Sequence, residues 1–275
     1  MADDQPQTVS LCQQMDQESL SLDSSFTFHC HAGQACFNQC CRTPTIILSP
    51  YDLLRLKQAL GITSGQLLER YTRQEIELNS NLPLVFIDAY RSPEGGCPFL
   101  GEHGCTVYPH RPAACRLFPL TMGSRLTPEG VEDHYFCRRL DYCEGFASEA
   151  EWTVTSWMTD QKFAEYDQGR REWLEILLKA GLTEQPVVDA LTQDLFATLA
   201  YDLDRFRRLV FDPVFLEAYE LKADALEGLQ TDDLAFLQFT YRYLPTLLSP
   251  AGAQKLAAVI RRHLLILDRE RSPVP

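Results

Sequence analysis

The sequence predicts a mainly α protein: an irregular, cysteine-rich metal-binding N-terminal domain with short helices and a few short strands, followed by an all-α helical C-terminal region. Two observations lead to this prediction. Nine of the ten cysteines lie between residues 30 and 143, and none follows. After residue 150, apolar and aromatic residues instead recur at helical spacing. The expected parts are a flexible polar tail (1–25), a cysteine-cluster metal-binding domain (26–146) and a helical domain (147–275).

Length, charge and the N-terminal segment exclude several classes of protein. With 275 residues, the chain can bury a core without disulfide staples. A formal net charge of −13 argues against nucleic acid or an anionic membrane surface as the main partner. Residues 1–20 resemble no secretory signal or transit peptide, and no apolar run approaches the roughly 20 residues that span a bilayer. We expect a cytoplasmic protein without membrane insertion, whose thiols stay reduced.

The clearest local pattern predicts a helix that begins at Pro50. Ser49 is a typical N-cap, Pro50 suits the first helical position, and Asp52 completes a pair that resembles a capping box. Gly61 is expected to end this helix. Its apolar stripe consists of Leu53, Leu54, Leu56 and Leu60.

Shorter elements are expected in the rest of the cysteine-rich part, where glycine and proline interrupt the apolar runs. They are a helix over 63–71, a strand over 82–90, a turn over 92–96, a short helix over 113–117 and a hairpin over 121–135 that turns at 127–130.

Helical periods dominate the C-terminal part, and its tryptophan and phenylalanine residues are expected to pack in a core. The expected helices are one or two that end before Gly181, then about 186–210, 213–227, 231–247 and 250–269. Residues 201–212 alternate acids and arginines at helical spacing. This alternation favours an ion-paired helix face over a set of catalytic carboxylates.

The nine clustered thiols are the main chemical pattern of the sequence. Their spacing matches neither the paired C-x2-C motifs of zinc fingers nor the cysteine run of bacterial ferredoxins. The clustering itself indicates metal binding, whereas Cys12 in the polar tail is expected to be a spectator thiol. Cys137 or Cys143 could instead only pack in a core. The candidate metal ligands are Cys30, Cys36, Cys40, Cys41, Cys97, Cys105, Cys115, Cys137 and Cys143.

The adjacent Cys40 and Cys41 restrict the kind of metal site. Neighbouring side chains of extended backbone point in opposite directions, so such a pair chelates one tetrahedral ion awkwardly. The pair suits a larger cluster, or two centres that are served from one backbone position. Nine thiols also exceed the four of one closed zinc site, and eight could serve two four-thiolate sites.

The neighbours of the thiols fit metal binding. Cationic side chains stabilise the thiolate form that binds metal, and nearby glycine and proline let backbone amides approach sulfur. The arginines beside cysteines are Arg42, Arg111, Arg116, Arg138 and Arg139. The nearby histidines are His29, His31, His103 and His110. We expect surface or outer positions for the histidines, with His31, inside the first cluster, as the best exception.

Several motifs together resemble the CxxCxxCC family of zinc- or iron-chelating domains, over about residues 26–145. They are Phe28-x-Cys30 with Cys36 and Cys40-Cys41, Ser49-Pro50-x-Asp52, Cys97-Pro98-Phe99-Leu100, Cys105-Thr106-Val107-Tyr108 and Arg111-Pro112-x-x-Cys115-Arg116-x-Phe118-Pro119. One departure is that five and three residues, in place of two and two, separate the first cysteines. One branch of the family is similar to flagellin lysine-N-methylase, which implies an iron–sulfur centre and S-adenosylmethionine.

The leading interpretation is an intracellular metal-binding protein that holds an iron–sulfur cluster, of the 4Fe-4S type, in cysteine thiolates. Electron transfer, metal handling and assembly of a partner complex all remain open, and another protein is the expected partner. The alternatives are a protein-lysine methyltransferase-like enzyme that uses S-adenosylmethionine, and a structural zinc-binding interaction scaffold. The sequence shows no glycine-rich nucleotide cradle, P-loop or nucleophile elbow, so enzymatic chemistry has no independent support.

Overall fold

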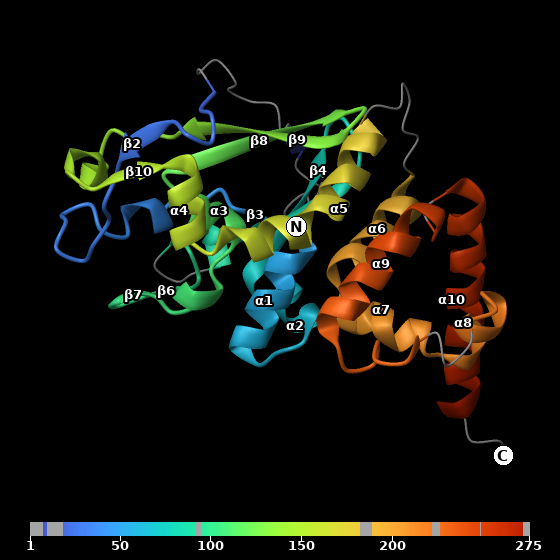
Figure 1. Cartoon of the computed structure of the whole chain (residues 1–275). Helices are drawn as coiled ribbons and strands as arrows, with labels where there is room; N and C mark the ends of the chain where they lie inside the picture. Colours follow the sequence, from blue (N-terminus) through green and yellow to red (C-terminus); the bar gives the residue numbers. More distant parts are fainter. Residues whose placement is uncertain are drawn as a thin grey trace. The chain divides into compact units, whose positions relative to one another are not determined.

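The computed structural model (Figure 1) describes residues 8–9, 19–91, 95–181, 189–221, 226–247 and 249–271. Helices make up most of the regular secondary structure, in agreement with the expected mainly α class. Among these residues, no helix has the length and apolar character needed to cross a membrane. Cys12 and positions 92–94 of the expected turn lie outside the described residues.

The chain divides into two compact units. The first comprises residues 1–62 and 66–186, and the second comprises 63–65 and 187–275. The division therefore falls well after the seam that the change in composition suggests near residue 147. The cysteine-bearing unit includes the first helices of the expected helical domain.

Helix α5 (Phe163–Gly181) explains this difference, because it packs inside the first unit. It contacts α1 (Pro50–Leu60) and the hairpin of β8 (Leu120–Thr127) and β9 (Gly130–Cys137), as Figure 1 shows. A Cβ atom at Gly169 would lie 2.3 Å from the ring of Tyr51, so this close approach of α5 to α1 depends on glycine. Helical periodicity alone cannot show against which part of a chain a helix packs.

Strands form more of the first unit than the sequence suggests. One sheet has the strand order β1-β4-β5-β3, with β1 parallel to β4 and the other pairs antiparallel. Its strands are β1 (Thr8–Val9), β3 (Ile47–Leu48), β4 (Thr72–Glu77) and β5 (Pro83–Ile87). Strand β5 corresponds to the strand expected over 82–90, and every residue of it is buried. Strand β4 was not expected, because its polar residues TRQEIE resemble no apolar strand pattern.

The N-terminal segment that was expected to be a flexible tail also contributes strands. Besides β1, strand β2 (Ser25–Thr27) pairs with β10 (Glu151–Thr153), and Leu20 forms a bridge to Tyr135. Residues 1–7 and 10–18 of the expected tail lie outside the described residues. The described parts of the segment are thus held by strands that lie far away in the sequence.

The expected start and end of helix α1 are confirmed. Ser49 Oγ accepts the Asp52 N–H at 3.1 Å, and Asp52 Oδ2 accepts the Ser49 N–H at 2.8 Å, which forms a capping box. Gly61 follows the helix at φ 64°, a left-handed conformation that favours glycine. Leu53, Leu54 and Leu56 are buried, so the expected stripe forms part of the core.

The remaining elements of this part of the chain are short. They are η1 (Gln39–Cys41), α2 (Ser64–Tyr71), η2 (Ala89–Arg91), β6 (Leu100–Gly101), β7 (Gly104–Cys105), η3 (Tyr108–His110), α3 (Ala113–Leu117), η4 (Glu144–Ala147) and α4 (Val154–Asp160). The short helix expected over 113–117 and the hairpin expected over 121–135 are both confirmed by α3 and by β8–β9.

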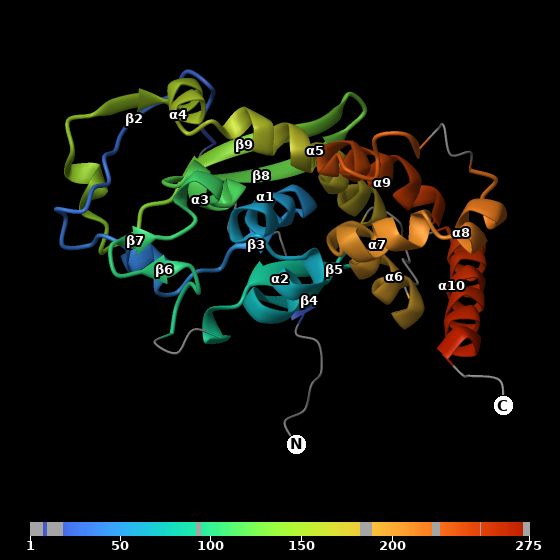
Figure 2. The same ribbon diagram turned by 90° about the horizontal axis from the view of Figure 1, so that it is seen from below.

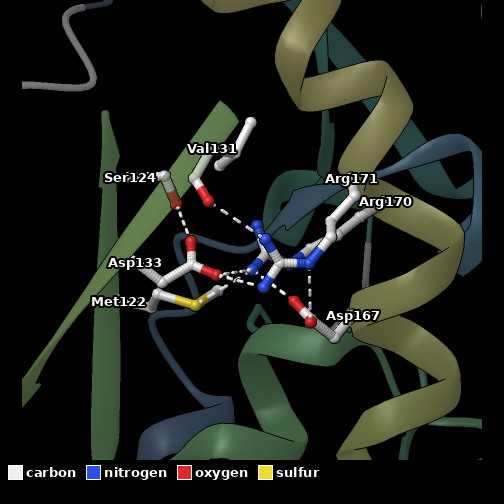
Figure 3. A network of polar contacts seen from close by, with 7 residues as sticks. All are labelled: Met122, Ser124, Val131, Asp133, Asp167, Arg170 and Arg171. Carbon is white, nitrogen blue, oxygen red and sulfur yellow. Dashed lines mark hydrogen bonds and ion pairs between the residues drawn. The ribbon is translucent and has the colours of Figure 1, made fainter. Parts of the chain in front are cut away.

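A buried ion-pair network attaches the β8–β9 hairpin to α5 (Figure 3). Arg170 donates to Asp133 at 3.0 Å and to Asp167 at 2.5 Å. Arg171 binds the same two carboxylates, at 2.9 and 3.0 Å. The side chains of Arg170 and Asp133 are only 7% and 4% exposed, so each charge depends on its partners for stabilisation.

The second unit is helical, and two of its expected helices are shorter than predicted. Asp202 ends one helix and caps the next, accepting the Arg205 N–H, so the helix expected over 186–210 is interrupted there. The helix expected over 213–227 ends at Ala218. The helices are α6 (Ala190–Tyr201), α7 (Leu203–Val210), α8 (Pro213–Ala218), α9 (Asp233–Leu247) and α10 (Pro250–Arg271).

The acids and arginines of residues 201–212 have structural roles, as expected. Arg207 pairs with Asp233 at 2.6 Å and lies over the ring of Phe236. Asp212 caps α8 through the Val214 N–H. The expected packing role of the aromatic residues also holds, because Phe236 is fully buried in this unit.

Candidate metal centre

The first cysteines lie on a loop of consecutive tight turns. The Gln39 N–H donates to the Cys36 carbonyl and the Cys41 N–H donates to the Asn38 carbonyl, both at 3.0 Å. Asn38 has φ 67°, a left-handed conformation that asparagine tolerates better than most residues. These turns place Cys36, Cys40 and Cys41 within one short stretch of chain.

This loop is bound to a second segment more than a hundred residues later in the chain. The Phe28 N–H donates to the Ala150 carbonyl and the His29 N–H to the Gly145 carbonyl, each at 3.0 Å. A Cβ atom at Gly145 would lie 2.5 Å from the Phe28 ring, so the two segments approach closely only because residue 145 is glycine. The backbone therefore brings residues 28–36 beside residues 143–150.

Glu144 extends this junction to the sulfur atoms. Its N–H donates to the Cys36 Sγ at 3.3 Å, and its carboxylate accepts the Ala35 N–H at 3.2 Å. Partial burial raises the pKa of Cys143, and the nearby Cys36 and Cys40 thiols raise it further. Cys143, which could have been a packing residue only, thus lies among the thiols of the first loop.

A second junction connects the vicinal cysteines with the Cys97 segment. The Cys97 N–H donates to the Cys41 carbonyl at 2.7 Å. Gly96 has φ 91°, and a Cβ atom there would lie 2.9 Å from the same carbonyl oxygen. Beyond Cys97, strands β6 and β7 pair Leu100 with Cys105. Figure 2 shows this hairpin next to the turn of η1.

Cys115 reaches the same region from helix α3. Burial raises the pKa of its thiol, and Cys97 and Cys105 are the next largest causes of the shift. The first turn of α3 is held by Asp52, whose Oδ1 accepts the Ala113 N–H at 2.8 Å. Asp52 therefore caps α1 and also fixes the helix that carries Cys115.

Backbone N–H groups point at three of the sulfur atoms in the same local way. The donor lies two residues after the cysteine: Phe99 for Cys97, Val107 for Cys105 and Gly145 for Cys143. Burial raises the pKa of each thiol, to about 11 for Cys97, and the N–H group opposes this shift. Such donors favour the thiolate, the form that binds metal.

The vicinal thiols interact with each other. The hydrogen bond between Cys40 and Cys41 lowers the pKa of Cys40 to about 7 and raises the pKa of Cys41. Burial is the largest cause that raises the pKa of Cys30 to about 11, followed by the Cys40, Cys36 and Cys143 thiols. For Cys41, the thiols of Cys97 and Cys115 contribute as well. The pair lies between thiols of the first loop and thiols of the Cys97–Cys115 segment.

Cys137 differs from the other eight. It ends strand β9, where it pairs with Leu120 across the hairpin. Burial raises its pKa and Arg139 opposes the shift, with no contribution from a neighbouring thiol. The causes of the pKa shifts thus link eight of the nine predicted ligands as electrostatic neighbours, and they do not link Cys137 to any of them.

The eight thiols are close without forming a finished coordination sphere. Within the described ranges, no three Cys, His, Asp or Glu side chains converge closely enough to hold one metal ion. All nine described cysteines are free. Their chemistry, eight soft thiol donors with N–H groups aimed at sulfur, fits a thiolate-bound metal. Closure of the loops around a metal would then couple binding to local folding.

Of the arginines beside cysteines, Arg111 is the best placed. Burial lowers its pKa, while Tyr108 and the thiols of Cys115 and Cys105 oppose the shift, so its guanidinium lies near both sulfur atoms. Arg116, although adjacent to Cys115 in sequence, instead hydrogen-bonds the Gln161 carbonyl and the Tyr166 hydroxyl. The position of Arg116 next to Cys115 in the sequence therefore predicted the wrong surroundings for its side chain. Adjacent side chains on α3 point in different directions.

The histidines of the first loop line a surface hollow of about 430 Å³. The rings of His29 and His31 lie 5.0 Å apart, and His31 Nδ1 accepts the Gly33 N–H at 3.1 Å. Both residues are exposed and belong to the surface beside the thiols. This agrees with the expected surface position of His29, and among the described residues His31 belongs to no group of three or more side chains that could hold a metal ion.

Two contributors were not expected from the sequence. Glu144 supplies an N–H to sulfur and a carboxylate to the loop, and Gly145 permits the close approach of its segment. In the sequence, only their position directly after Cys143 indicated that these two residues lie near the thiols. Neither the hydrogen bond from Ala113 to Asp52 nor these contacts follow from local sequence, since each connects distant segments.

Residues 29–144 match the model of the CxxCxxCC family, described as "Putative zinc- or iron-chelating domain". The resemblance expected from the cysteine motifs is therefore confirmed over these residues. No curated protein and no solved structure matches the chain.

Proposed function

We propose that the thiol group of the first unit holds an iron–sulfur cluster of the 4Fe-4S type. The observation that carries this proposal is the gathering of eight thiols from distant segments, three of them with an N–H donor two residues further on. When bound, such a cluster supplies one-electron redox chemistry, whose potential depends on charge and on hydrogen bonds to sulfur. The chain's own contribution is to position the thiolates and these donors.

Two features favour iron over a single zinc ion. Eight thiols exceed the four ligands of one zinc site, and Cys40 contributes to the raised pKa of thiols in both segments, Cys30 as well as Cys97 and Cys115. Arg111 lies near the thiols of Cys105 and Cys115 and would offset the negative charge of a thiolate-bound cluster. Electron transfer, metal handling and assembly of a partner complex are the roles that such a centre supports.

We further propose a cytoplasmic location and a protein partner. The described cysteines are free, and a reducing compartment keeps thiols available for metal. The net charge of −13 favours a partner other than nucleic acid. The second unit, which carries no cysteine, is the part that we assign to partner binding.

Zinc is the second candidate, because four thiols per ion is the usual composition of a structural zinc site. Metal analysis of protein purified without oxygen distinguishes the two. We expect iron and acid-labile sulfide in comparable amounts, and a visible absorption band that dithionite bleaches. Stoichiometric zinc without sulfide, after expression with both metals supplied, would replace the iron–sulfur proposal by the zinc scaffold.

Matched serine variants test the ligand set in the same assay. Cys115→Ser is expected to lose metal, because the thiols of Cys97, Cys105 and Cys40 all contribute to the raised pKa of Cys115. Cys137→Ser serves as the control, since Cys137 has no neighbouring thiol that shifts its pKa. Equal metal contents in the two variants would contradict the assignment of the eight thiols.

A further inference from the structure

The sulfur atoms of Cys36 and Cys143 meet, although more than a hundred residues separate them in the sequence. Their thiols form a hydrogen bond with each other. The Glu144 N–H also donates to the Cys36 Sγ at 3.3 Å, which holds this sulfur beside the residue that follows Cys143. The Cys36 sulfur therefore has two hydrogen-bonding partners in the distant segment.

The backbone on both sides of this pair is fixed by further hydrogen bonds. Strand β2 pairs with β10, and the His29 N–H donates to the Gly145 carbonyl at 3.0 Å. The Ala35 N–H, one residue before Cys36, donates to the Glu144 carboxylate at 3.2 Å. The two sulfur atoms are thus brought together by the packing of two chain segments and not only by the rotamers of two side chains.

A second pair of thiols, Cys40 and Cys41, is also hydrogen-bonded. Adjacent residues have Cα atoms about 3.8 Å apart across a trans peptide. Most disulfides instead require Cα atoms that are about 4.4–6.8 Å apart, so a bond between adjacent cysteines is strained. Cys36 and Cys143 belong to separate segments and are free of this restriction. Of the two hydrogen-bonded pairs, they are the better suited to form a disulfide.

Small reagents can reach this pair. Cys36 and Cys143 are both half-buried rather than enclosed in the core. The surface hollow of about 430 Å³ is lined by Gln34 and Glu144, which lie close to the two cysteines in the sequence. An oxidant of the size of hydrogen peroxide therefore has access to the sulfur atoms.

We propose that Cys36 and Cys143 form a reversible disulfide in the metal-free protein, which removes two thiols from the metal site. This inference rests on the proposed function, because it concerns when these thiols are available to metal. With hydrogen peroxide as the oxidant, one thiolate attacks the O–O bond, becomes a sulfenic acid and releases water. The second thiolate attacks that sulfur, which forms the S–S bond and releases a second water. The two thiols lose two electrons and two protons, and a dithiol reductant restores them.

Disulfide mapping tests the pairing directly. Metal-free full-length protein is treated with an equimolar amount of hydrogen peroxide, alkylated and digested without reduction, and fragmentation of the linked peptides locates each bond. We expect the Cys36–Cys143 link to dominate and to disappear after dithiothreitol. Cys36→Ser and Cys143→Ser should each lack it, whereas Cys137→Ser, which has no thiol neighbour that shifts its pKa, should keep it. A dominant link between any other two cysteines, or no disulfide at all, would overturn the proposal.

A variant that keeps every thiol tests the junction between the two segments. A Cβ atom at Gly145 would lie 2.5 Å from the Phe28 ring, so Gly145→Ala should separate the segments and form the link several-fold more slowly. Gly181→Ala is the matched control, because a Cβ atom there would meet Asn79 at an ordinary 3.5 Å. Far-ultraviolet circular dichroism verifies that both variants are folded. Equal rates of linkage would contradict the role of the junction.

Zinc(II) alone probes the consequence for the metal site. Reduced and peroxide-treated samples of the full chain are incubated with zinc(II), desalted and analysed for bound zinc. We expect the oxidised sample to hold less zinc and to regain the difference after dithiothreitol, since the thiolate is the form that binds metal. Equal zinc contents would overturn the proposal. A reduced chain that binds neither zinc nor iron would instead overturn the proposed function, which the disulfide map does not test.

Discussion

Asp52 Oδ1 accepts the Ala113 N–H at 2.8 Å, across 61 residues of sequence. The other oxygen of the same carboxylate accepts the Ser49 N–H and closes the capping box of α1. One buried side chain thus fixes the N-termini of two helices, α1 and α3. Helix α3 carries Cys115. The Ser49-Pro50-x-Asp52 motif therefore supports the thiol group by holding the start of α3 through a hydrogen bond, and not by supplying a metal ligand.

Replacing Asp52 is expected to destabilise the first unit and to weaken metal binding. Asp52→Ala removes the cap of α1 and leaves the buried Ala113 N–H without its acceptor, at a cost of about 2 kcal/mol. Urea unfolding of the metal-free protein measures the loss of stability, and metal content measures the effect on the site. Asp194→Ala, at an exposed position of α6, is the control. Identical unfolding midpoints for the two variants would contradict this role.

The network of Arg170 and Asp133 predicts a large difference between two neighbouring residues of β9. Asp133→Ala leaves the buried guanidinium of Arg170 without one of its partners, which we expect to cost about 3 kcal/mol. Glu132→Ala removes an exposed partner of Arg125 instead, and should leave the unfolding midpoint nearly unchanged. Chemical denaturation of both variants makes the comparison. Similar losses would mean that the network does not stabilise the attachment of the hairpin to α5.

In metal-free protein, Cys40 is expected to react with alkylating reagents faster than the adjacent Cys41. Its hydrogen bond with Cys41 lowers the pKa of Cys40 to about 7, below the ordinary value for a thiol, and raises the pKa of Cys41. The thiolate fraction of Cys40 should therefore rise steeply around pH 7, where about half of the thiol is ionised, and level off roughly two pH units higher. Alkylation with iodoacetamide, followed by peptide mass spectrometry, measures each residue. Preferential labelling of Cys41 would reverse the assignment.

Removal of metal is expected to affect the two units differently. All described cysteines lie in the first unit, so binding free energy contributes to its folding and not directly to that of helices α6–α10. Hydrogen exchange of the full chain, with metal and after anaerobic chelation, tests this expectation. Amides of residues 28–41 and 97–105 should exchange faster after chelation, whereas the protection of α6–α10 should persist. Loss of protection throughout the chain would show that the two units unfold together.

Local patterns in the sequence correctly predicted several elements. The capping box of Ser49 and Asp52, the left-handed Gly61, the short α3 and the β8–β9 hairpin all depend on neighbouring residues, whose preferences act within a few positions. Strand β4 was missed because its stability comes from pairing with β1 and β5 rather than from its own polar residues. The helix expected over 186–210 was too long because Asp202 interrupts it.

By itself, the sequence determined that nine thiols are concentrated in one part of the chain and that they match a metal-chelating family. Only the tertiary structure decided which thiols are neighbours. The contact of Glu144 with Cys36 depends on a hydrogen bond between segments about a hundred residues apart, and Cys137 is held in the β8–β9 hairpin, where it pairs with Leu120. Spacing along a chain limits the distance between adjacent thiols, but distant segments meet only through the packing and hydrogen bonding of the folded protein.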